Sequence, residues 1–418
     1  AASTSPAGSW IRVLGGWHPG QLDERRAPTQ EELDVAAPHN PVYVQLLYQE
    51  AFLNQAGLRA AGLETAGSLG AAFQEVLGRI PPAGHEARVA STKAFMAELN
   101  GLGMTGVVDP GGFGILPESY RALFDVWRRQ EGTLRVRLYL VPWERGRELE
   151  QVREWVRYVH PGFGDGMLRY VGMGEVLSFS CHDIEGVKPF QMSASAKAEL
   201  LEITRVLARH GWPAHVHAIL DGTIGAVLDV WEEVDEELGL AGRRFSLAHA
   251  EPIGEENLQR VARLGAGIAV QDRLIFRSAD SAALWGKEVA QRSPPLRRML
   301  ELGIPMGAGT DATVVTPHNP WRCLWWLVTG ESLDGAVARI PEQRLTRAEA
   351  LLIYTAGSAW FSFEETSRGT LEPGKLADLA VLSDDYFEVP AAEIPNLRSV
   401  LTMVDGRVVH AGEGFEGL

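Results

Sequence analysis

The chain has 418 residues, of which 45% are hydrophobic and 22% are charged, a composition typical of a globular protein that can form one large α/β domain and an accessory one. The formal net charge is −15 at pH 7, and no run of Lys or Arg offsets it locally, which argues against nucleic acid as a partner. No apolar run approaches the roughly 20 residues that a membrane-spanning helix needs, which argues against a membrane protein.

Seven short apolar segments alternate with helical patterns along the chain, and this alternation predicts parallel strands joined by crossover helices. The predicted strands begin near Thr105, Val136, Met167, Pro213, Arg244, Gly265 and Ile304. Seven such units favour an α/β fold of the (β/α)₈ TIM-type barrel class with one strand unaccounted for. A doubly wound open sheet is the competing arrangement.

Helix signals lie between and after these strands. The pattern "SAKAELLEITRVLARHG" ends at Gly211, a usual helix stop. After the last strand, "TRAEALLIYTAGSAWF" opens with a capping box, in which Thr346 is followed three residues on by Glu349. We expect a closing helix there.

The hydrophobic pattern of the sequence changes past residue 360, where short alternating segments replace the helical patterns. Turn signals stand at Pro373-Gly374 and at Asp405-Gly406. We therefore predict a barrel over residues 1–360 and the C-terminal part of a small β-sandwich annex over residues 361–418.

Polar side chains stand at the ends of several predicted strands: Asp109, Glu175, His217, His249 and Asp311. Catalytic groups of a TIM-type barrel lie at the C-terminal ends of its strands, so this distribution favours the barrel over the open sheet. Imidazole nitrogens and a carboxylate are ligands that Zn²⁺ takes, and an open coordination position lowers the pKa of bound water to roughly 7. We predict a metal site with His217, His249 and Asp311.

Several motifs resemble the amidohydrolase superfamily, in particular the branch that includes N-substituted formamide deformylases. They are "VHAILD", "LAHAE", "GAGTDAT", "NPW", "LTRAEALLIYTAGSAWF", "GTLEPGKLADLAVL" and "VDGRVV". The resemblance runs from about Trp10 to the C-terminus. It implies a metal-dependent hydrolase that acts on a C–N bond in a small-molecule amide, formamide or cyclic amide.

The resemblance also implies roles for individual residues. His217 and His249 match the metal-binding histidines of the fifth and sixth barrel strands, and Asp311 matches the eighth-strand aspartate that binds metal and carries protons. Asp221 matches an aspartate that follows the fifth-strand histidine and orients a neighbour. His215 is expected to point away from His217 and to be packed or to support the ligands from behind.

The fourth strand departs from the superfamily pattern, because no lysine that could bridge two metals precedes Lys188. Glu175 either replaces that lysine as a ligand or is a solvated or ion-paired glutamate. Cys181 and His182 are further options, although a buried cysteine more often only packs. We expect one or two divalent ions, zinc first and manganese or iron as alternatives.

The first strand departs as well, because the superfamily's H-x-H motif has no counterpart there: the H-x-H of this chain is His215–His217, already assigned to the fifth strand. The segment 62–70, "GLETAGSLG", is also shorter than the β-rich insert of relatives. A barrel without one strand has two unpaired edges, which folded proteins avoid. We therefore expect that the sequence is incomplete, or that a partner polypeptide or a second copy supplies the strand.

Substrate contacts are expected from Asp221 and from the segment "NPWRCLWWLVTG" that follows Asp311. Trp321 is the predicted substrate-binding tryptophan, since large rigid rings suit an apolar pocket wall. Plain helix packing is the alternative for these tryptophans. Tyr48 and Gln49 stand where the deformylase branch carries a histidine that contacts substrate, so the deformylase substrate does not carry over directly to this chain.

The predicted activity is metal-assisted hydrolysis with Asp311 as the catalytic proton carrier. The competing function is a non-catalytic homologue that serves as a structural or regulatory subunit, because the H-x-H motif and the bridging lysine are missing. With two cysteines, Cys181 and Cys323, the chain fits a reducing compartment, and we expect a cytoplasmic protein.

Overall fold

The computed structural model describes residues 3, 5–63, 73–183, 188–333, 335 and 337–417. The chain forms two compact units. The smaller comprises Ala1–Gly84, Asp272–Phe276 and Thr310–Asn319, and the larger comprises His85–Gln271, Arg277–Gly309 and Pro320–Leu418. Most of the short segment 62–70 lies outside the described residues. The boundary predicted at residue 360 falls inside the larger unit and stays a prediction.

The smaller unit contains a three-stranded sheet in the order β1-β2-β3, with β1 parallel and β3 antiparallel to β2. Our strand predictions begin only at Thr105 and missed this sheet, because strands of 3 to 5 residues show no clear alternation. Its elements are β1 (Ile11–Val13), a 3-10 helix (Pro19–Gln21), α1 (Gln30–Ala36), β2 (Val42–Leu46), β3 (Glu50–Leu53), α2 (Gln55–Ala61) and α3 (Phe73–Arg79).

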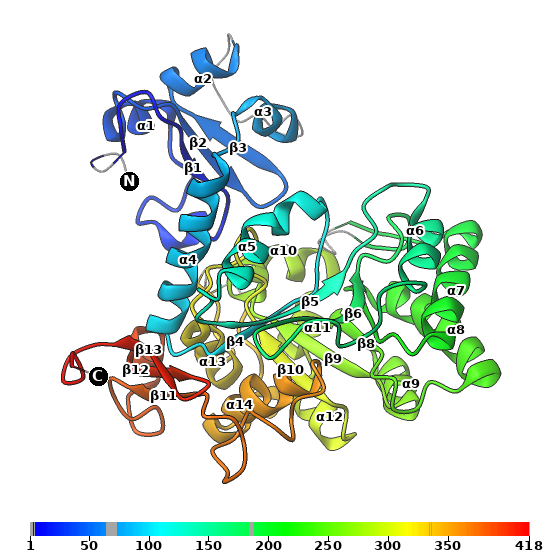
Figure 1. The fold of residues 1–418 in the computed structure, drawn as a ribbon. Coiled ribbons are helices and arrows are strands. Elements are labelled where there is room, and N and C mark those ends of the chain that lie inside the picture. The colour runs from blue at the N-terminus through cyan, green and yellow to red at the C-terminus, as the bar shows by residue number, and fades with distance from the viewer. Residues whose placement is uncertain are drawn as a thin grey trace. The chain divides into compact units, whose positions relative to one another are not determined.

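The larger unit is built on a curled sheet of seven parallel strands, in the order β10-β9-β8-β7-β6-β5-β4 (Figure 1). All seven predicted strands are confirmed. They are β4 (Gly106–Asp109), β5 (Arg135–Leu140), β6 (Leu168–Glu175), β7 (Ala214–Ala218), β8 (Ser246–His249), β9 (Gly267–Gln271) and β10 (Met306–Gly309). Within the described residues β4 and β10 remain the two edges, so the sheet is an open part of a barrel.

Helices follow the strands and cover the sheet, as expected for crossover units. The α-helices are α4 (His85–Gly101), α5 (Arg121–Arg128), α6 (Glu148–Trp155), α7 (Ala194–Arg209), α8 (Asp221–Leu238), α9 (Glu255–Leu264), α10 (Leu274–Trp285), α11 (Lys287–Arg292), α12 (Leu296–Glu301), α13 (Pro320–Thr329), α14 (Arg347–Leu352) and α15 (Ser358–Trp360). The described residues also form short helical turns: 3-10 helices at Pro117–Tyr120, Pro341–Gln343 and Ala391–Asn396, and a π-helix at Ile353–Gly357.

Two helix signals read from the sequence are confirmed. The Thr346 hydroxyl accepts from the Glu349 amide at 3.3 Å, and the Glu349 carboxylate accepts from the Thr346 amide at 2.8 Å, which forms the expected capping box of α14. Gly211 follows α7 with a φ of +70°, a left-handed conformation that glycine adopts at low cost.

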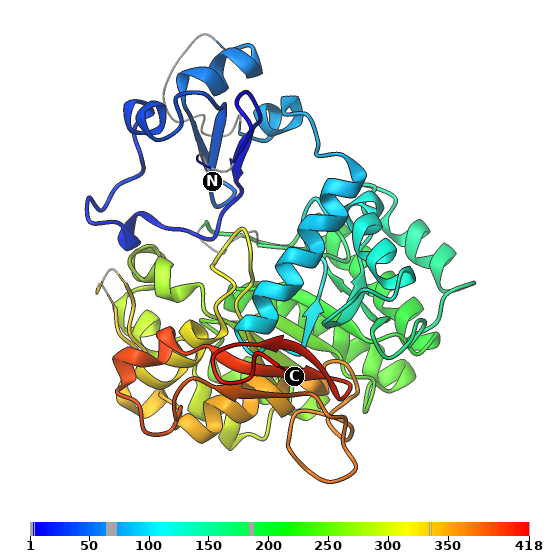
Figure 2. The ribbon, with the colours of Figure 1, turned by 60° about the vertical axis from the view of Figure 1, so that its left-hand side comes forward.

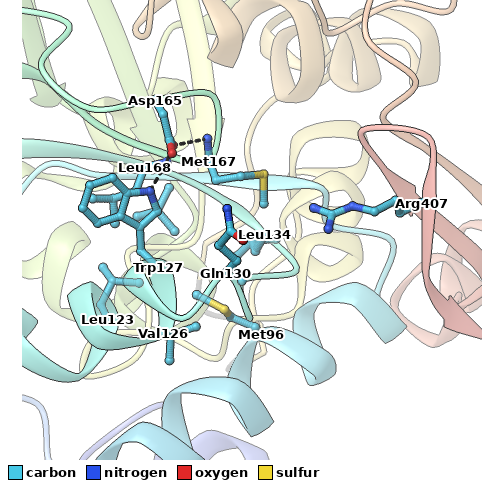
Figure 3. A pocket seen from close by; sticks show the side chains of 12 residues that line it. Met96, Leu123, Val126, Trp127, Gln130, Leu134, Asp165, Met167, Leu168 and Arg407 are labelled. Carbon is cyan, nitrogen blue, oxygen red and sulfur yellow. Dashed lines mark hydrogen bonds between the residues drawn. The ribbon is translucent and has the colours of Figure 1, made fainter.

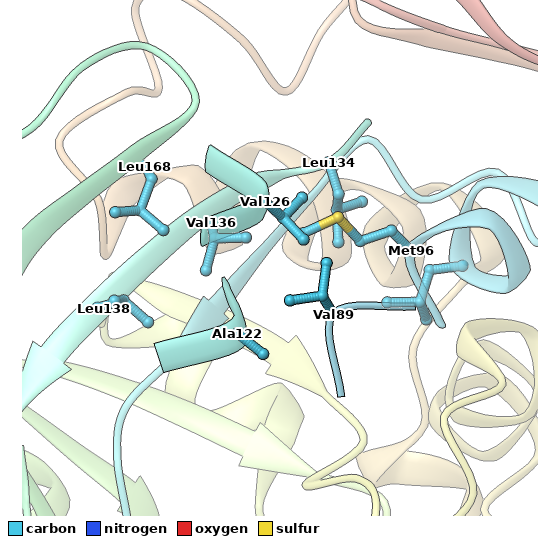
Figure 4. Packing of buried hydrophobic residues seen from close by; sticks show 9 residues of the cluster. Val89, Met96, Ala122, Val126, Leu134, Val136, Leu138 and Leu168 are labelled. Atoms are coloured by element: carbon cyan, nitrogen blue, oxygen red, sulfur yellow. The ribbon is translucent and has the colours of Figure 1, made fainter. Parts of the chain in front are cut away.

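The core of the larger unit between α4, α5 and the neighbouring strands is aliphatic (Figure 4). Leu138 on β5 and Val126 on α5 are fully buried, and Met96 reaches them from α4. Burying an aliphatic side chain of this size contributes roughly 1.5–3 kcal/mol. This cluster fixes β5 beside β6, the strand that carries Glu175.

The C-terminal segment forms a three-stranded antiparallel sheet of β11 (Leu379–Leu382), β12 (Ser399–Val404) and β13 (Arg407–Ala411). The hairpin predicted at Asp405-Gly406 joins β12 to β13. This sheet lies beside α4 (Figure 2), where the Thr402 hydroxyl donates to the Asn100 carbonyl at 2.6 Å. The described residues give one sheet here, so the β-sandwich is not confirmed.

A buried ion network connects β5 to the C-terminal segment. The Arg137 guanidinium donates to both carboxylate oxygens of Glu364, at 2.7 and 2.9 Å, and Arg368 reaches the same carboxylate at 2.8 Å. Arg137 has no exposed side-chain surface, and the Glu364 side chain is only 5% exposed.

Among the described helices, none has the length and apolar character required to span a bilayer.

Candidate metal centre

Three side chains meet at the C-terminal ends of adjacent strands. His217 Nδ1 lies 3.0 Å from His249 Nε2, and Glu175 Oε2 lies 3.5 Å from the former and 3.6 Å from the latter. Glu175 ends β6, His217 is on β7 and His249 ends β8. Because these strands are parallel neighbours, their carboxyl ends lie side by side and the three ligand atoms converge.

The donor set fits a divalent metal ion. Two imidazole nitrogens and a carboxylate oxygen lie within 4.8 Å of one another, and this combination is the common ligand set of zinc and similar ions. His217 and His249 are buried and Glu175 is nearly so. Burial raises the pKa of the Glu175 carboxyl, but the imidazoles of His217 and His249 outweigh burial and hold that pKa well below its usual range.

Close backbone approach positions Glu175. Gly174 has a φ of +141°, and a Cβ there would lie 1.7 Å from the His215 carbonyl oxygen. Gly111, in the loop after β4, would place a Cβ 1.8 Å from Val141 Cγ2 and 2.8 Å from the Gly174 carbonyl oxygen. Only glycine fits at both positions. His249 itself has a φ of +73°, the kind of uncommon backbone conformation that clusters at functional sites.

The segment after β6 supports His217 from behind. Asp183 is buried and its carboxylate accepts from the amides of Ile219 and Leu220, at 3.0 and 2.6 Å. Its Oδ1 also lies 3.7 Å from His217 Nε2, the ring nitrogen that points away from the ligand cluster. Carboxylates in this position orient metal-binding histidines. Asp183 was not among the predicted site residues, and its only signal in the sequence is its place shortly after a strand that ends in Glu175.

His182 lies next to Asp183 and contacts the same strand. Its Nδ1 bonds to the His217 carbonyl oxygen at 2.8 Å, and burial lowers its pKa to about 4. Cys181 is buried and its thiol donates to the Ala196 carbonyl oxygen, which is a packing role. Lys188 follows β6 by more than ten residues, so Glu175 is the ligand that this strand offers.

The prediction that His215 points away from His217 is wrong, because residues two apart on a strand share one face. His215 lies on the side of β7 that carries His217, nearer the start of the strand. Its Nδ1 bonds to the Ser246 hydroxyl at 2.7 Å, and its ring packs between Tyr139 and Phe361. Burial lowers the pKa of His215 to about 4, so the ring is neutral at physiological pH. The two histidines of this H-x-H therefore share a face of β7 but have different partners, Ser246 for His215 and His249 for His217.

Asp109, at the end of β4, is another carboxylate near this edge of the sheet. It accepts from the Gly111 amide at 2.9 Å, and burial raises its pKa. Four residues after Asp109, the Phe113 ring meets the rings of His217 and His182 edge-on, at centroid distances of 5.7 and 6.0 Å. The loop after β4 thus provides an apolar wall beside the cluster.

The two residues expected to contact substrate have other partners. The Asp221 carboxylate, at the start of α8, accepts from the Gly254 amide at 2.7 Å and from Asn257 Nδ2 at 2.8 Å. The Trp321 ring is buried, and its indole donates to the Leu102 carbonyl oxygen at 3.0 Å. Asp221 therefore ties two loops together, and Trp321 has the contacts of a packed helix residue.

Asp311 follows β10 and has a φ of +55°. It belongs to the segment Thr310–Asn319, which is part of the smaller unit, whereas His217 and His249 belong to the larger one. Its role as a metal ligand and proton carrier stays a prediction.

A cavity of about 270 Å³ lies at the other end of the strands (Figure 3). Leu168 at the start of β6 lines it, whereas Glu175 ends the same strand, roughly 20 Å further along an extended chain. The cavity is therefore separate from the metal cluster. Its lining comprises Met96, Leu123, Val126, Trp127, Gln130, Gly132, Leu134, Val136, Asp165, Met167, Leu168 and Arg407.

Two relatives align over almost the whole chain. An N-substituted formamide deformylase from Arthrobacter pascens is 25% identical over 96% of this chain and 79% of its own length. A putative amidohydrolase from Bacillus subtilis, YtcJ, is 25% identical over 97% of this chain and 80% of its own length.

Solved structures share the fold. An uncharacterised metal-dependent hydrolase from Pyrococcus horikoshii superposes with a TM-score of 0.67 at 22% identity, over 94% of this chain and 80% of its own. Atrazine chlorohydrolase TrzN from Arthrobacter aurescens, solved with zinc, gives a TM-score of 0.56 at 17% identity, over 99% and 84%. The sequence pattern of the amidohydrolase family matches residues 1–410, and the chain belongs to this family.

Proposed function

We propose that this protein is a metal-dependent hydrolase of a C–N bond in a small non-peptide amide, formamide or cyclic amide. The observation that carries the proposal is the convergence of Glu175, His217 and His249 on one point at the C-terminal ends of three adjacent strands. Membership of the amidohydrolase family supports hydrolysis, and the deformylase relative supports an amide or formamide substrate.

His217 Nδ1, His249 Nε2 and Glu175 Oε2 would hold the ion. A divalent metal in such a site acidifies water and polarises a carbonyl group. Zinc suits two imidazoles and a carboxylate, and manganese or iron are the alternatives. Asp311 is the proposed proton carrier to the leaving nitrogen, and Asp221 would act indirectly by fixing the loops after β7 and β8.

Metal content tests the proposal. Purified wild-type protein is expected to hold close to one equivalent of zinc, manganese or iron per chain by elemental analysis, and His217→Ala and His249→Ala are expected to lose it. His215→Ala is the matched control, because it removes an imidazole of the same strand that bonds to Ser246 and lies outside the ligand cluster. It should leave the metal in place.

Hydrolysis of N-substituted formamides, acyl amides and small lactams by the metal-loaded protein then tests the reaction. A folded wild-type protein that binds no metal and hydrolyses none of these compounds would instead be a non-catalytic homologue. That second function is favoured by one observation, the absence of an H-x-H on a strand between β10 and β4 in the part of the sheet that the structure describes.

A further inference from the structure

A hydrogen bond of His182 fixes which of its two ring nitrogens carries the proton. Its Nδ1 lies 2.8 Å from the His217 carbonyl oxygen, and a carbonyl oxygen only accepts hydrogen bonds. The proton of the neutral ring must therefore be on Nδ1, where it donates. Nε2 of His182 is then left with a lone pair and acts as an acceptor.

This acceptor is buried, and no donor for it lies among the described residues. His182 is 3% exposed, and its Nε2 has no hydrogen-bond partner among the residues that the structure describes. Buried polar atoms in folded proteins are nearly always satisfied, and an unsatisfied buried acceptor destabilises the fold. Such an atom calls for a specific explanation, and a catalytic or ligand-binding role is one of those known.

The surroundings of His182 connect it to the metal centre. Its ring lies 5.9 Å from the ring of His217, whose Nδ1 belongs to the ligand cluster. Phe113 packs edge-on against both rings, and Phe179 lies 6.3 Å beyond Phe113. A molecule bound at the cluster thus meets an aromatic wall with one hydrogen-bond acceptor in it, the usual make-up of a small-molecule site.

We propose that His182 is a substrate-contacting residue whose Nε2 accepts a hydrogen bond from the N–H of a secondary amide or formamide. The inference rests on the proposed C–N hydrolase function and narrows its substrate class. A secondary amide carries one N–H next to the carbonyl carbon that is attacked, whereas a tertiary amide carries none. A site built to bond an N–H discriminates strongly against an analogue that lacks it.

Binding measurements on matched ligands test this inference. N-phenethylformamide and its N-methyl derivative differ in the N–H alone, and the phenyl group suits the wall of Phe113 and Phe179. Calorimetry on the zinc-loaded wild-type protein is expected to show at least tenfold tighter binding of the N–H compound. Equal affinities, or no binding of either compound, would overturn the inference.

Two substitutions separate the roles of the two ring nitrogens. The amide of His182→Asn occupies the place of Nδ1, so it keeps the donor to the His217 carbonyl and removes the acceptor. The longer side chain of His182→Gln places an oxygen near the position of Nε2. We expect His182→Asn to bind both formamides equally while retaining its zinc, and His182→Gln to keep part of the preference. A preference unchanged in His182→Asn contradicts the inference.

The tautomer gives a test that needs no ligand or activity. In a long-range ¹H–¹⁵N spectrum of protein labelled at histidine, the signals that disappear in His182→Asn should show a protonated Nδ1 and an unprotonated Nε2. A proton on Nε2 overturns the inference and leaves the hydrolase proposal intact. Failure of the hydrolase proposal would appear differently, as a wild-type protein that holds no metal and hydrolyses no amide.

Discussion

Asp183 holds the C-terminal end of β7 through two backbone amides and faces the outer nitrogen of His217. Replacing it with asparagine keeps the size but removes the charge that favours the Nε2–H form of His217, in which Nδ1 is free to bind metal. Loss of such a supporting carboxylate lowers metal affinity by about 10- to 100-fold. We expect this range for Asp183→Asn in a zinc competition titration.

Asp165→Asn provides the control, because Asp165 precedes β6 at the opposite end from Glu175 and accepts from the Met167 and Leu168 amides. Its zinc affinity should equal that of the wild type. An Asp183→Asn protein with wild-type affinity would show that Asp183 only shapes the loop.

His215 makes stability depend on pH. Its pKa is about 4 in the folded protein because of burial, against 6.5 for an ordinary histidine. Between these values the unfolded chain binds a proton that the folded chain does not, so the free energy of unfolding falls as pH decreases from 6.5 toward 4. We expect His215→Gln to have a shallower decrease in this interval, measured by urea unfolding across the pH range. An unchanged slope would contradict a neutral buried ring.

The possible metal ligands could be predicted from the sequence, whereas the contacts of the residues that support them could not. His217, His249 and Glu175 each end or nearly end an apolar run, and the rule that parallel strands share one carboxyl edge brings them together. Asp183 and His182 follow β6 in a loop, and no periodicity predicts where a loop returns. Their contacts with the end of β7 depend on tertiary packing alone.

Gly174 sets the path of β6 just before its ligand. Any side chain there would overlap the His215 carbonyl and the conformation at a φ of +141° would be strained. We expect Gly174→Ala to separate the ends of β6 and β7, to lower the unfolding free energy by roughly 1–3 kcal/mol, and to release the metal. Thermal unfolding together with elemental analysis measures both effects.

Gly222→Ala is the matched control, since a Cβ at Gly222 in the first turn of α8 has open space around it. It should keep its metal. Metal retained at wild-type level in Gly174→Ala would mean that Glu175 does not depend on this close approach.

The seven parallel strands were predictable because each is a buried apolar run followed by a long amphipathic segment. The sheet of the smaller unit was not, because its strands are short and lack that context. The absence of a first barrel strand stays a prediction from the absent motif, and in the described sheet β4 and β10 are not paired with each other.

The Arg137–Glu364 pair stabilises the larger unit as a whole, because it joins residues 227 positions apart. Burial raises the pKa of Glu364, but hydrogen bonds from Arg137 and the charge of Arg368 outweigh it and lower the pKa to about 2. The carboxylate therefore stabilises the fold fully above pH 4.5, and this contribution is lost as pH falls toward 2.

Breaking a buried ion pair by removing one charge costs about 3–5 kcal/mol. We expect Glu364→Gln to lower the free energy of unfolding by an amount of this order at pH 7, and to remove part of the acid sensitivity between pH 4.5 and 2. Glu372 has an exposed carboxylate 3.6 Å from Lys375, and Glu372→Gln should change stability by less than about 1 kcal/mol. Equal effects of both substitutions would contradict the role of the buried network.

The order of the sheet also determines how the metal site should respond to local opening. Glu175, His217 and His249 come from β6, β7 and β8, and each of these strands has a paired neighbour on both sides. Fraying starts at outer strands, which have fewer backbone partners. Amide deuterium exchange should therefore be fastest in β4 and slowest in β7. Zinc should then dissociate only when the whole larger unit unfolds, so that its release and the loss of β7 protection occur at the same denaturant concentration.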